Sequence, residues 1–440
     1  MTAVIVAIAL GALIASMQYR ALTPAESRIA NYSLVAHVAG SFVQYALQEY
    51  YYGISDAHGY IEFGGFMSRA VEADFTRFAP EVLKVILQRP NDFPPEMGGG
   101  PTGGSATSSM AGLAAVVSYF FGDSLLVACV VVSLLAWNGQ LLFYRVARET
   151  IAVSERKPAL YAVMLMPSVI FWGSGFNKEA FAVSSLGLLS FGLYRVAASR
   201  SFLYSPLIVI GVIGVAVTKP YILYPFAIAV GAWIYVARVA ANGRDVFRPT
   251  YLALAATIAI GGIALTSQIF PEYSPTKVAE TTAMQQGLWT TVEAGSTFEF
   301  GSADARTPIE QLPFVPFALA NALFRPFVFE ARNGPMLGAA LETTWLMWLS
   351  FSTLRRFRLR ELRGALLSSP LLVFSFVFVI TFAVAVGLAT SNLGSLSRYR
   401  MPMIPMYAAL LLLLREKLAT SQKAAREALA RPAAVRVAAP

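Results

Sequence analysis

The chain has 440 residues, of which 56% are apolar and 13% charged, and its mean hydropathy is +0.59. A soluble domain averages about 45–50% apolar and about 25% charged residues. The apolar excess lies in blocks of roughly 20 residues, the length at which a helix crosses a bilayer. The composition therefore excludes an ordinary soluble protein and predicts an all-α polytopic membrane protein.

The few cysteines and histidines limit the chemistry further. The single cysteine, Cys129, lies in an apolar run, which excludes a disulfide within the chain. The two histidines, His37 and His58, are too few for a histidine-rich metal site. The basic residues that give the net charge of +9 are distributed among the loops as membrane orientation requires. We therefore expect no nucleic-acid partner.

Eleven stretches have the length and apolarity of transmembrane helices. They lie at about 3–18, 30–49, 125–145, 158–175, 180–196, 203–218, 221–238, 250–268, 335–354, 365–389 and 402–418. The stretch at 30–49 is unusually polar, because it holds Asn31, His37, Gln44, Gln48 and Glu49. It either crosses the bilayer or lies along its surface, and the second alternative leaves ten spans.

Basic residues separate to one side of this topology. Six segments on that side hold 22 of the 34 lysines and arginines but only 7 of the 25 acids. Because basic loops stay in the cytoplasm, this side is predicted to be cytoplasmic. It includes the arginine cluster at 355–363 and a basic tail at 419–440, which follows a single membrane domain over 1–418.

Two long segments, at about 50–124 and 269–334, are predicted on the outer side. In the first, apolar residues at near-helical spacing over 60–89 predict amphipathic helices at the interface. Residues 110–121 are too short to span and predict a half-helix beside a cavity. In the second, the proline-broken stretch 312–331 predicts a re-entrant or interfacial segment, because a full span there would place the 355–363 cluster outside.

The glycine run at 98–104 lacks the Lys-Ser/Thr that completes a phosphate-binding loop. A mobile linker is the favoured interpretation of this run.

A short polar segment carries the first candidate residues. Asp56 and His58 lie where the second span gives way to water-facing sequence, with Tyr60 and Glu62 directly behind them. An acid at a bilayer surface, backed by aromatic rings, suits proton transfer in a reaction on a substrate carried by a lipid. The alternative is that Asp56 only caps the helix that follows it.

Basic residues on the outer side oppose the charge bias and are candidates for binding an anionic group. Lys178 and Lys219 each stand at a short outer turn. Arg398 and Arg400 precede the last span, and an arginine fork can hold phosphate oxygens in pairs. The alternatives are an aromatic anchor with a polar helix cap at Lys178, and snorkelling to lipid phosphates for the arginines.

Supporting residues are expected around these cations. Asn177 and Glu179 flank Lys178 at the start of a helix. Arg325 and Glu330, set among phenylalanines, form either a simple ion pair or part of a cavity lining. Glu342 lies within a predicted span, where a carboxylate is costly and requires a partner.

Two motifs resemble those of the bacterial membrane glycosyltransferases of the GT-C superfamily: Ser55-Asp56-Ala57-His58-Gly59-Tyr60 and Arg398-Tyr399-Arg400-Met401-Pro402. The segments Ser174-Gly-Phe-Asn-Lys178-Glu179 and Phe324-Arg-Pro-Phe327 look like those of poorly characterised relatives. By this resemblance Asp56 matches the catalytic acid and candidate ligand of a divalent cation (Mg or Mn), and Arg398 or Arg400 matches the phosphate-binding arginine.

The resemblance implies transfer of a sugar from a polyprenyl-phosphate donor to a glycan or lipid-linked acceptor. The reaction would take place on the periplasmic or outer face of the bacterial inner membrane, with the C-terminus in the cytoplasm. The chain departs from the pattern in two ways. The expected acid pair is reduced to Asp56 with His58, and no large soluble outer domain follows the last span.

Other classes stay open beside this one. A polysaccharide polymerase or ligase would also show outer arginines and a long outer loop. A transporter would need polar groups midway along its spans, and few are present beyond Glu342 and Lys219. A non-catalytic membrane component of an exopolysaccharide assembly or export machine, acting with partners of a cell-envelope glycan complex, also fits the sequence.

Overall fold

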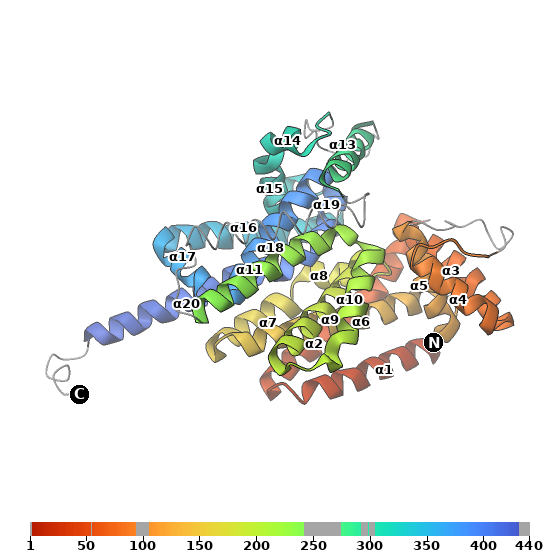
Figure 1. Ribbon diagram of the computed structural model, residues 1–440, viewed down its shortest axis with the longest axis horizontal. Helices are drawn as coiled ribbons and strands as arrows, with labels where there is room; N and C mark the ends of the chain where they lie inside the picture. Colours follow the sequence, from red (N-terminus) through yellow and green to blue (C-terminus); the bar gives the residue numbers. More distant parts are fainter. Residues whose placement is uncertain are drawn as a thin grey trace.

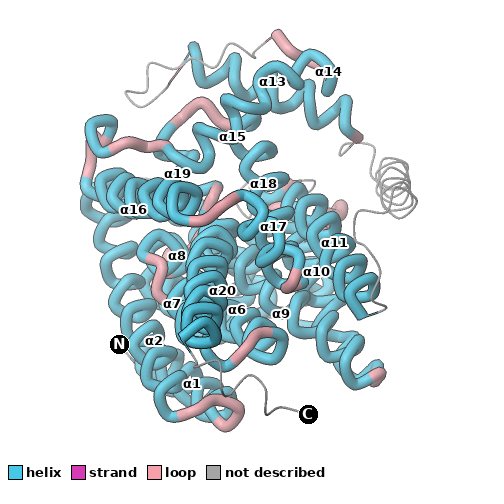
Figure 2. The backbone as a smooth tube through the Cα atoms, turned by 90° about the vertical axis from the view of Figure 1, so that its left-hand side faces the viewer, coloured by secondary structure: helices cyan, strands magenta, loops and turns pink. Residues whose placement is uncertain are grey.

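The computed structural model describes residues 2–53, 55–93, 105–241, 274–291, 298 and 304–430. Every regular element in these ranges is a helix, which confirms the all-helical part of the prediction (Figure 2). The predicted span at 250–268, the glycine run at 98–104 and the end of the tail at 431–440 lie outside the described residues.

Within the described ranges, five helical segments are long and apolar enough to cross a membrane. They are α1 (Thr2–Tyr19), α6 (Leu125–Thr150), α9 (Lys178–Ser199), η4 with α11 (Pro220–Ile222 and Leu223–Ala241) and α18 (Pro370–Ala389). Two shorter apolar helices are α5 (Ala106–Phe121) and α10 (Ser205–Thr218), the latter preceded by η3 (Phe202–Tyr204). These helices indicate a membrane protein with fewer spans, by this criterion, than the eleven predicted.

The polar stretch at 30–49 lies in α2 (Pro24–Ala46), which continues into the π-helix η1 (Leu47–Tyr52). The polar residues Ser33, His37 and Ser41 are fully buried, while Tyr32 and Val35 are more than 60% exposed. A helix that turns its polar side inward and its apolar side outward has the pattern expected of a lipid-facing helix. α2 is not among the five segments that are apolar enough to cross, so the membrane-crossing alternative stays a prediction.

The predicted continuous span at 158–175 is wrong. The structure breaks it into α7 (Arg156–Met164) and α8 (Pro167–Gly173). Pro167 has no amide proton to continue a helix, and the ring of a proline disfavours helical geometry in the residue before it. Met166 accordingly has the extended angles φ −68° and ψ 122°.

The first outer segment forms α3 (Asp56–Ala73) and α4 (Phe75–Ile86), which pack with α5 at one end of the molecule (Figure 1). At the opposite end lie α17 (Leu359–Leu367) and the last turns of α20 (Ile404–Ala430). The predicted outer helices and the basic cluster at 355–363 are therefore at opposite ends. α5 starts at Ala106, earlier than the half-helix expected from residue 110.

The second outer segment consists of short helices. The re-entrant or interfacial stretch contains α15, whose 10 residues rise about 15 Å, half the hydrocarbon thickness of a bilayer. The elements around it are α13 (Pro275–Thr291), α14 (Pro308–Gln311), η6 (Leu312–Phe314), α15 (Val315–Phe324) and η7 (Val328–Glu330). The remaining elements are η2 (Val153–Glu155), α16 (Gly334–Arg356), α19 (Leu393–Tyr399) and η8 (Met401–Met403).

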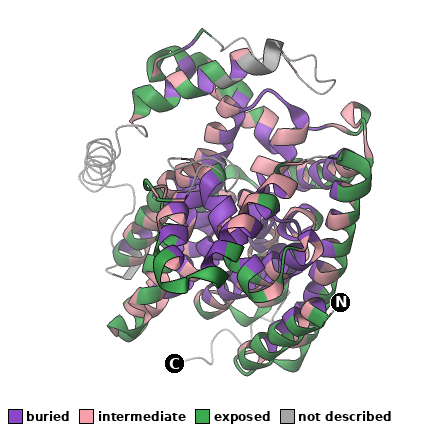
Figure 3. Cartoon of the chain, turned by 90° about the vertical axis from the view of Figure 1, so that its right-hand side faces the viewer, coloured by how far each residue is buried: buried purple, intermediate pink, exposed green. Residues whose placement is uncertain are grey.

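The buried interior follows the central helices (Figure 3). Helices α6 and α9 approach very closely where Gly139 faces Gly187 and Ser184, and a Cβ atom on Gly187 would overlap the carbonyl oxygen of Gly139. Small residues at such a crossing allow two backbones to touch. This contact fixes α9, whose first turn carries several candidate site residues.

Candidate functional site

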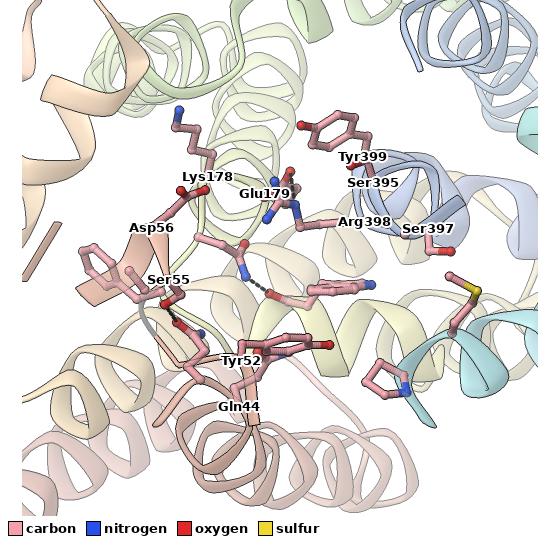
Figure 4. Close-up of a pocket in the computed structure, with 18 of the residues that line it drawn as sticks. Gln44, Tyr52, Ser55, Asp56, Lys178, Glu179, Ser395, Ser397, Arg398 and Tyr399 are labelled. Atoms are coloured by element: carbon pink, nitrogen blue, oxygen red, sulfur yellow. Dashed lines mark hydrogen bonds and ion pairs between the residues drawn. The ribbon is translucent and has the colours of Figure 1, made fainter. Parts of the chain in front are cut away.

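A cavity of about 540 Å³ lies between residues of α2, η1, α3, the α8–α9 turn, α16 and α19 (Figure 4). It brings together seven of the residues predicted from the sequence. They are Asp56, Tyr60, Asn177, Lys178, Glu179, Lys219 and Arg398. These come from four stretches of the chain that are far apart in sequence.

Asn177 explains how α9 begins at the cavity. Its side-chain oxygen accepts a hydrogen bond from the amide of Ala180 (2.9 Å), which is a normal helix cap. Its side-chain nitrogen donates to the carbonyl of Trp172 (2.7 Å) and thereby fixes the α8–α9 turn. Asn177 is therefore a capping residue that sets the direction of Lys178 and Glu179.

Glu179 is buried and neutralised by two cations. Its Oε1 atom lies 2.9 Å from Lys219 Nζ and 3.3 Å from Arg398 Nε. Burial alone would lower the pKa of Lys219, but the Glu179 carboxylate outweighs it and the pKa rises. The same carboxylate raises the pKa of Arg398. Both side chains therefore stay charged. Glu179 cancels one of their two positive charges, and the other is left over.

Lys178 has a weaker set of partners. Its Nζ atom donates to the Thr107 hydroxyl (3.2 Å) and lies 6.0 Å from the centre of the Tyr60 ring. Tyr60 also hydrogen-bonds with Thr107, while burial and the nearby Asp56 raise the pKa of Tyr60 to about 12. The Tyr60 hydroxyl therefore keeps its proton, and the lysine is held by neutral groups rather than by a contacting carboxylate.

Asp56 is the exposed carboxylate of the cavity. It is the first residue of α3, and among the described residues it has no hydrogen-bond or ion-pair partner. Its charge acts on Tyr60, Lys178 and Arg398 without direct contact. In Figure 4 it lies between Lys178 above and Ser55 below, and Tyr52 and Gln44 lie further down. Asp56 does not hydrogen-bond a helix amide, so capping does not account for its carboxylate.

Three long helices begin at the cavity. Its lining includes the first residues of α3 (Asp56, Ala57), α9 (Lys178, Glu179) and α16 (Pro335, Met336). The first turn of a helix carries a partial positive charge, which favours anions, although the first-turn amides of Ala180 in α9 and Met336 in α16 are already capped by Asn177 and Asn333. Together with the three cations, these helix ends make the cavity suited to a negatively charged group.

Several predicted site residues lie elsewhere. His58 does not line the cavity, because its ring is held between Ser55 and Glu49. Glu62 lies on the exposed side of α3. Arg325 and Glu330 form an ion pair, with Arg325 Nε 2.9 Å from Glu330 Oε1, and neither lines the cavity. The simple ion-pair alternative therefore describes them.

Arg400 does not fit the expected phosphate-binding role. It is fully buried and donates to the carbonyl of Arg325 (2.6 Å) and to the Thr343 hydroxyl. These neutral acceptors leave its guanidinium away from the cavity. Glu342 accepts hydrogen bonds from the amide (2.8 Å) and hydroxyl (2.5 Å) of Ser168, so its partner is the start of α8 rather than a ligand.

The cavity offers few ligands for a divalent cation. The described residues contain no group of three or more histidine, cysteine or acidic side chains able to hold a metal. At the cavity, Glu179 is already neutralised and Asp56 stands as a single carboxylate. Hard cations prefer several oxygen ligands. The residues that line the cavity therefore do not fit a bound metal.

Some cavity residues were not among the predicted site residues. Gln44, Gln48, Tyr52 and Trp172 line it, together with Tyr399. Gln44 is fixed by donating to the carbonyl of Phe171 (2.8 Å). The signal in the sequence was the pair of amides inside an otherwise apolar span, since polar groups at membrane depth usually face a cavity or protein interior.

Comparisons of the chain with protein-family models, curated proteins and solved structures give no match. The geometry of the cavity is therefore the basis for the function proposed below.

Proposed function

We propose that the protein is a GT-C-like membrane glycosyltransferase that moves a sugar from a polyprenyl-phosphate donor to a glycan or lipid-linked acceptor. The observation that carries this proposal is the Asp56 carboxylate, which has no ion-pair partner in the described part of the chain and lies in the same cavity as Lys178, Lys219 and Arg398. The reaction takes place at the outer face of the bacterial inner membrane, where α3 to α5 lie, and the C-terminus is cytoplasmic.

In this proposal Asp56 is the general base. It accepts the proton of an acceptor hydroxyl while that oxygen bonds to the anomeric carbon of the sugar and the bond to the donor phosphate breaks. Lys178, Arg398 and the first turns of α3, α9 and α16 stabilise the charge that develops on the leaving phosphate. Glu179 holds Arg398 and Lys219 in position.

The Asp56→Asn variant tests the proposal in cells that carry it as their only copy. Asparagine keeps the shape of the side chain but cannot accept the proton, so we expect glycan output to fall about 100-fold or more. The Glu62→Gln variant is the matched control, because Glu62 is exposed on the same helix and lies outside the cavity. Membrane levels of both variants are measured by immunoblotting.

Normal glycan output from Asp56→Asn at a normal protein level would contradict the enzymatic role. That outcome would favour a non-catalytic component of a polysaccharide assembly or export machine. The glycan that accumulates in cells with the inactive variant would identify a polymerase or ligase. Such cells would contain short lipid-linked repeats rather than an unmodified acceptor.

A further inference from the structure

Ser55 has unusual partners for a residue in its position. It is the N-cap of α3, where a serine hydroxyl normally accepts a hydrogen bond from an amide of the first turn, but it makes no such bond. Its oxygen lies 3.0 Å from His58 Nδ1, and His58 Nε2 lies 3.0 Å from Glu49 Oε2. A hydroxyl, an imidazole and a carboxylate are thus connected in series, the arrangement that activates a nucleophile.

The positions of the protons decide whether Ser55 is activated. In neutral His58, Nε2 carries the proton and donates it to Glu49, so Nδ1 is free to accept from Ser55. In the structure the Ser55 hydroxyl donates to the Gln48 side-chain oxygen (3.1 Å), and its one proton cannot serve both Gln48 and Nδ1. Because the two ends of an amide have the same shape, turning Gln48 over directs an N–H to Ser55 Oγ. The Ser55 proton is then available to His58 Nδ1, and the Gln48 N–H supports negative charge on the serine oxygen.

This series opens into the cavity. Ser55 and Gln48 line it, while His58 and Glu49 lie outside its lining, with 31% and 40% of their side chains exposed. The amides of Asp56 and Ala57 follow Ser55, and no acceptor for them is present among the described residues. An amide directly after a nucleophilic serine is a common donor to the oxyanion in ester-cleaving enzymes.

We propose that Ser55, His58 and Glu49 form a nucleophile–base–acid relay that cleaves a carboxylic ester bound in the cavity. Ser55 Oγ bonds to the ester carbonyl carbon while its proton passes to His58 Nδ1, and His58 then protonates the departing alcohol as the ester bond breaks. A water or a second alcohol, deprotonated by His58, takes the acyl group and restores Ser55. This activity goes beyond glycosyl transfer and does not depend on it.

The test uses a fluorophosphonate probe on the purified full-length protein in lipid nanodiscs. The Ser55 oxygen bonds to phosphorus as fluoride leaves, and peptide mass spectrometry locates the label. We expect the label on Ser55, its loss in Ser55→Ala, and a rate about 100-fold lower in His58→Gln. In Glu49→Gln, which keeps the side-chain shape, the rate should fall about tenfold or more, because a neutral amide stabilises the imidazolium less.

Ser124 provides the control, because it is the partly exposed N-cap of α6 and its hydroxyl caps that helix through the amide of Val127 (3.5 Å). Ser124 should stay unlabelled, and Ser124→Ala should not change labelling at Ser55. A thermal unfolding transition like that of the wild type establishes that each variant is folded. The proposal would be overturned by absence of label on Ser55 in the folded protein, or by an unchanged rate in folded His58→Gln. Neither result depends on a sugar donor, so both leave the glycosyltransferase proposal to its own test.

Discussion

Glu179 is the residue that ties the cavity together. Its buried carboxylate joins the first turn of α9 to Lys219, at the junction of α10 and η4, and to Arg398 on α19. Removing one partner from a buried ion pair is costly, because the other charge is left without compensation in a poorly solvated place.

The Glu179→Gln variant should therefore lower the free energy of unfolding by about 3 kcal/mol, the low end of the range for buried pairs, because Arg398 is about a third exposed. Thermal or denaturant unfolding in detergent measures the change. Glu280→Gln is the matched control: Glu280 pairs with Lys277 at the surface, and its loss should cost about 0–1 kcal/mol. Equal stabilities of the two variants would refute the structural role of Glu179.

The two neighbouring arginines show what a sequence can and cannot predict about a residue. Both Arg398 and Arg400 oppose the charge bias, and for this reason both were predicted to bind a phosphate. Arg398 lines the cavity, whereas Arg400 points into the protein and holds the end of α15 through the carbonyl of Arg325. Arg398 and its partner Glu179 are 219 residues apart in the chain. Tertiary packing alone therefore identifies such partners.

At the scale of elements, the crossing of α6 and α9 places the charged first turn of α9. The crossing depends on Gly139 and Gly187, whose backbones leave no room for a side chain between them. The break between α7 and α8 depends on Pro167 and was recognisable from the sequence, although the continuous apolar character of 158–175 outweighed it in the prediction.

A methyl group at this crossing should be destabilising. We expect Gly187→Ala to lower the free energy of unfolding by about 1–3 kcal/mol, the usual cost of overpacking. Gly231→Ala is the control, because Gly231 of α11 has open space where a Cβ would lie, and alanine favours a helix by up to about 1 kcal/mol over glycine. If thermal unfolding of Gly187→Ala matches that of the wild type, the close packing of α6 on α9 is wrong.

At the scale of the whole molecule, charge and hydropathy predicted the arrangement of the segments better than they predicted the contacts of the site residues. The segregation of basic residues predicted that α3 to α5 and the 355–363 cluster lie on opposite sides, and the structure places them at opposite ends. The number of spans was harder to predict, since the proline break between α7 and α8 divides an apolar stretch into two helices that are each too short to cross.

Cysteine labelling tests this sidedness directly. The chain has one native cysteine, Cys129, which is buried and should stay unlabelled. A membrane-impermeant maleimide should label Thr76→Cys on α4 in intact spheroplasts, because Thr76 is exposed on the predicted outer side. Ser199→Cys, at the far end of α9, should be labelled only after the membrane is opened. The reverse pattern would place the cavity on the cytoplasmic side.

The central claim is that Lys178 binds a lipid-linked phosphate in the cavity. The affinity of the purified protein for a long-chain polyprenyl phosphate tests this claim most directly. Lys178 is held by the Thr107 hydroxyl rather than by a contacting acid, so Lys178→Met should leave the fold intact. A hydrogen bond to a charged group contributes about 1.5–3 kcal/mol, so this variant should bind about tenfold or more weakly. Lys277→Met, outside the cavity, should bind like the wild type. Equal affinity of the wild type and Lys178→Met would contradict the account.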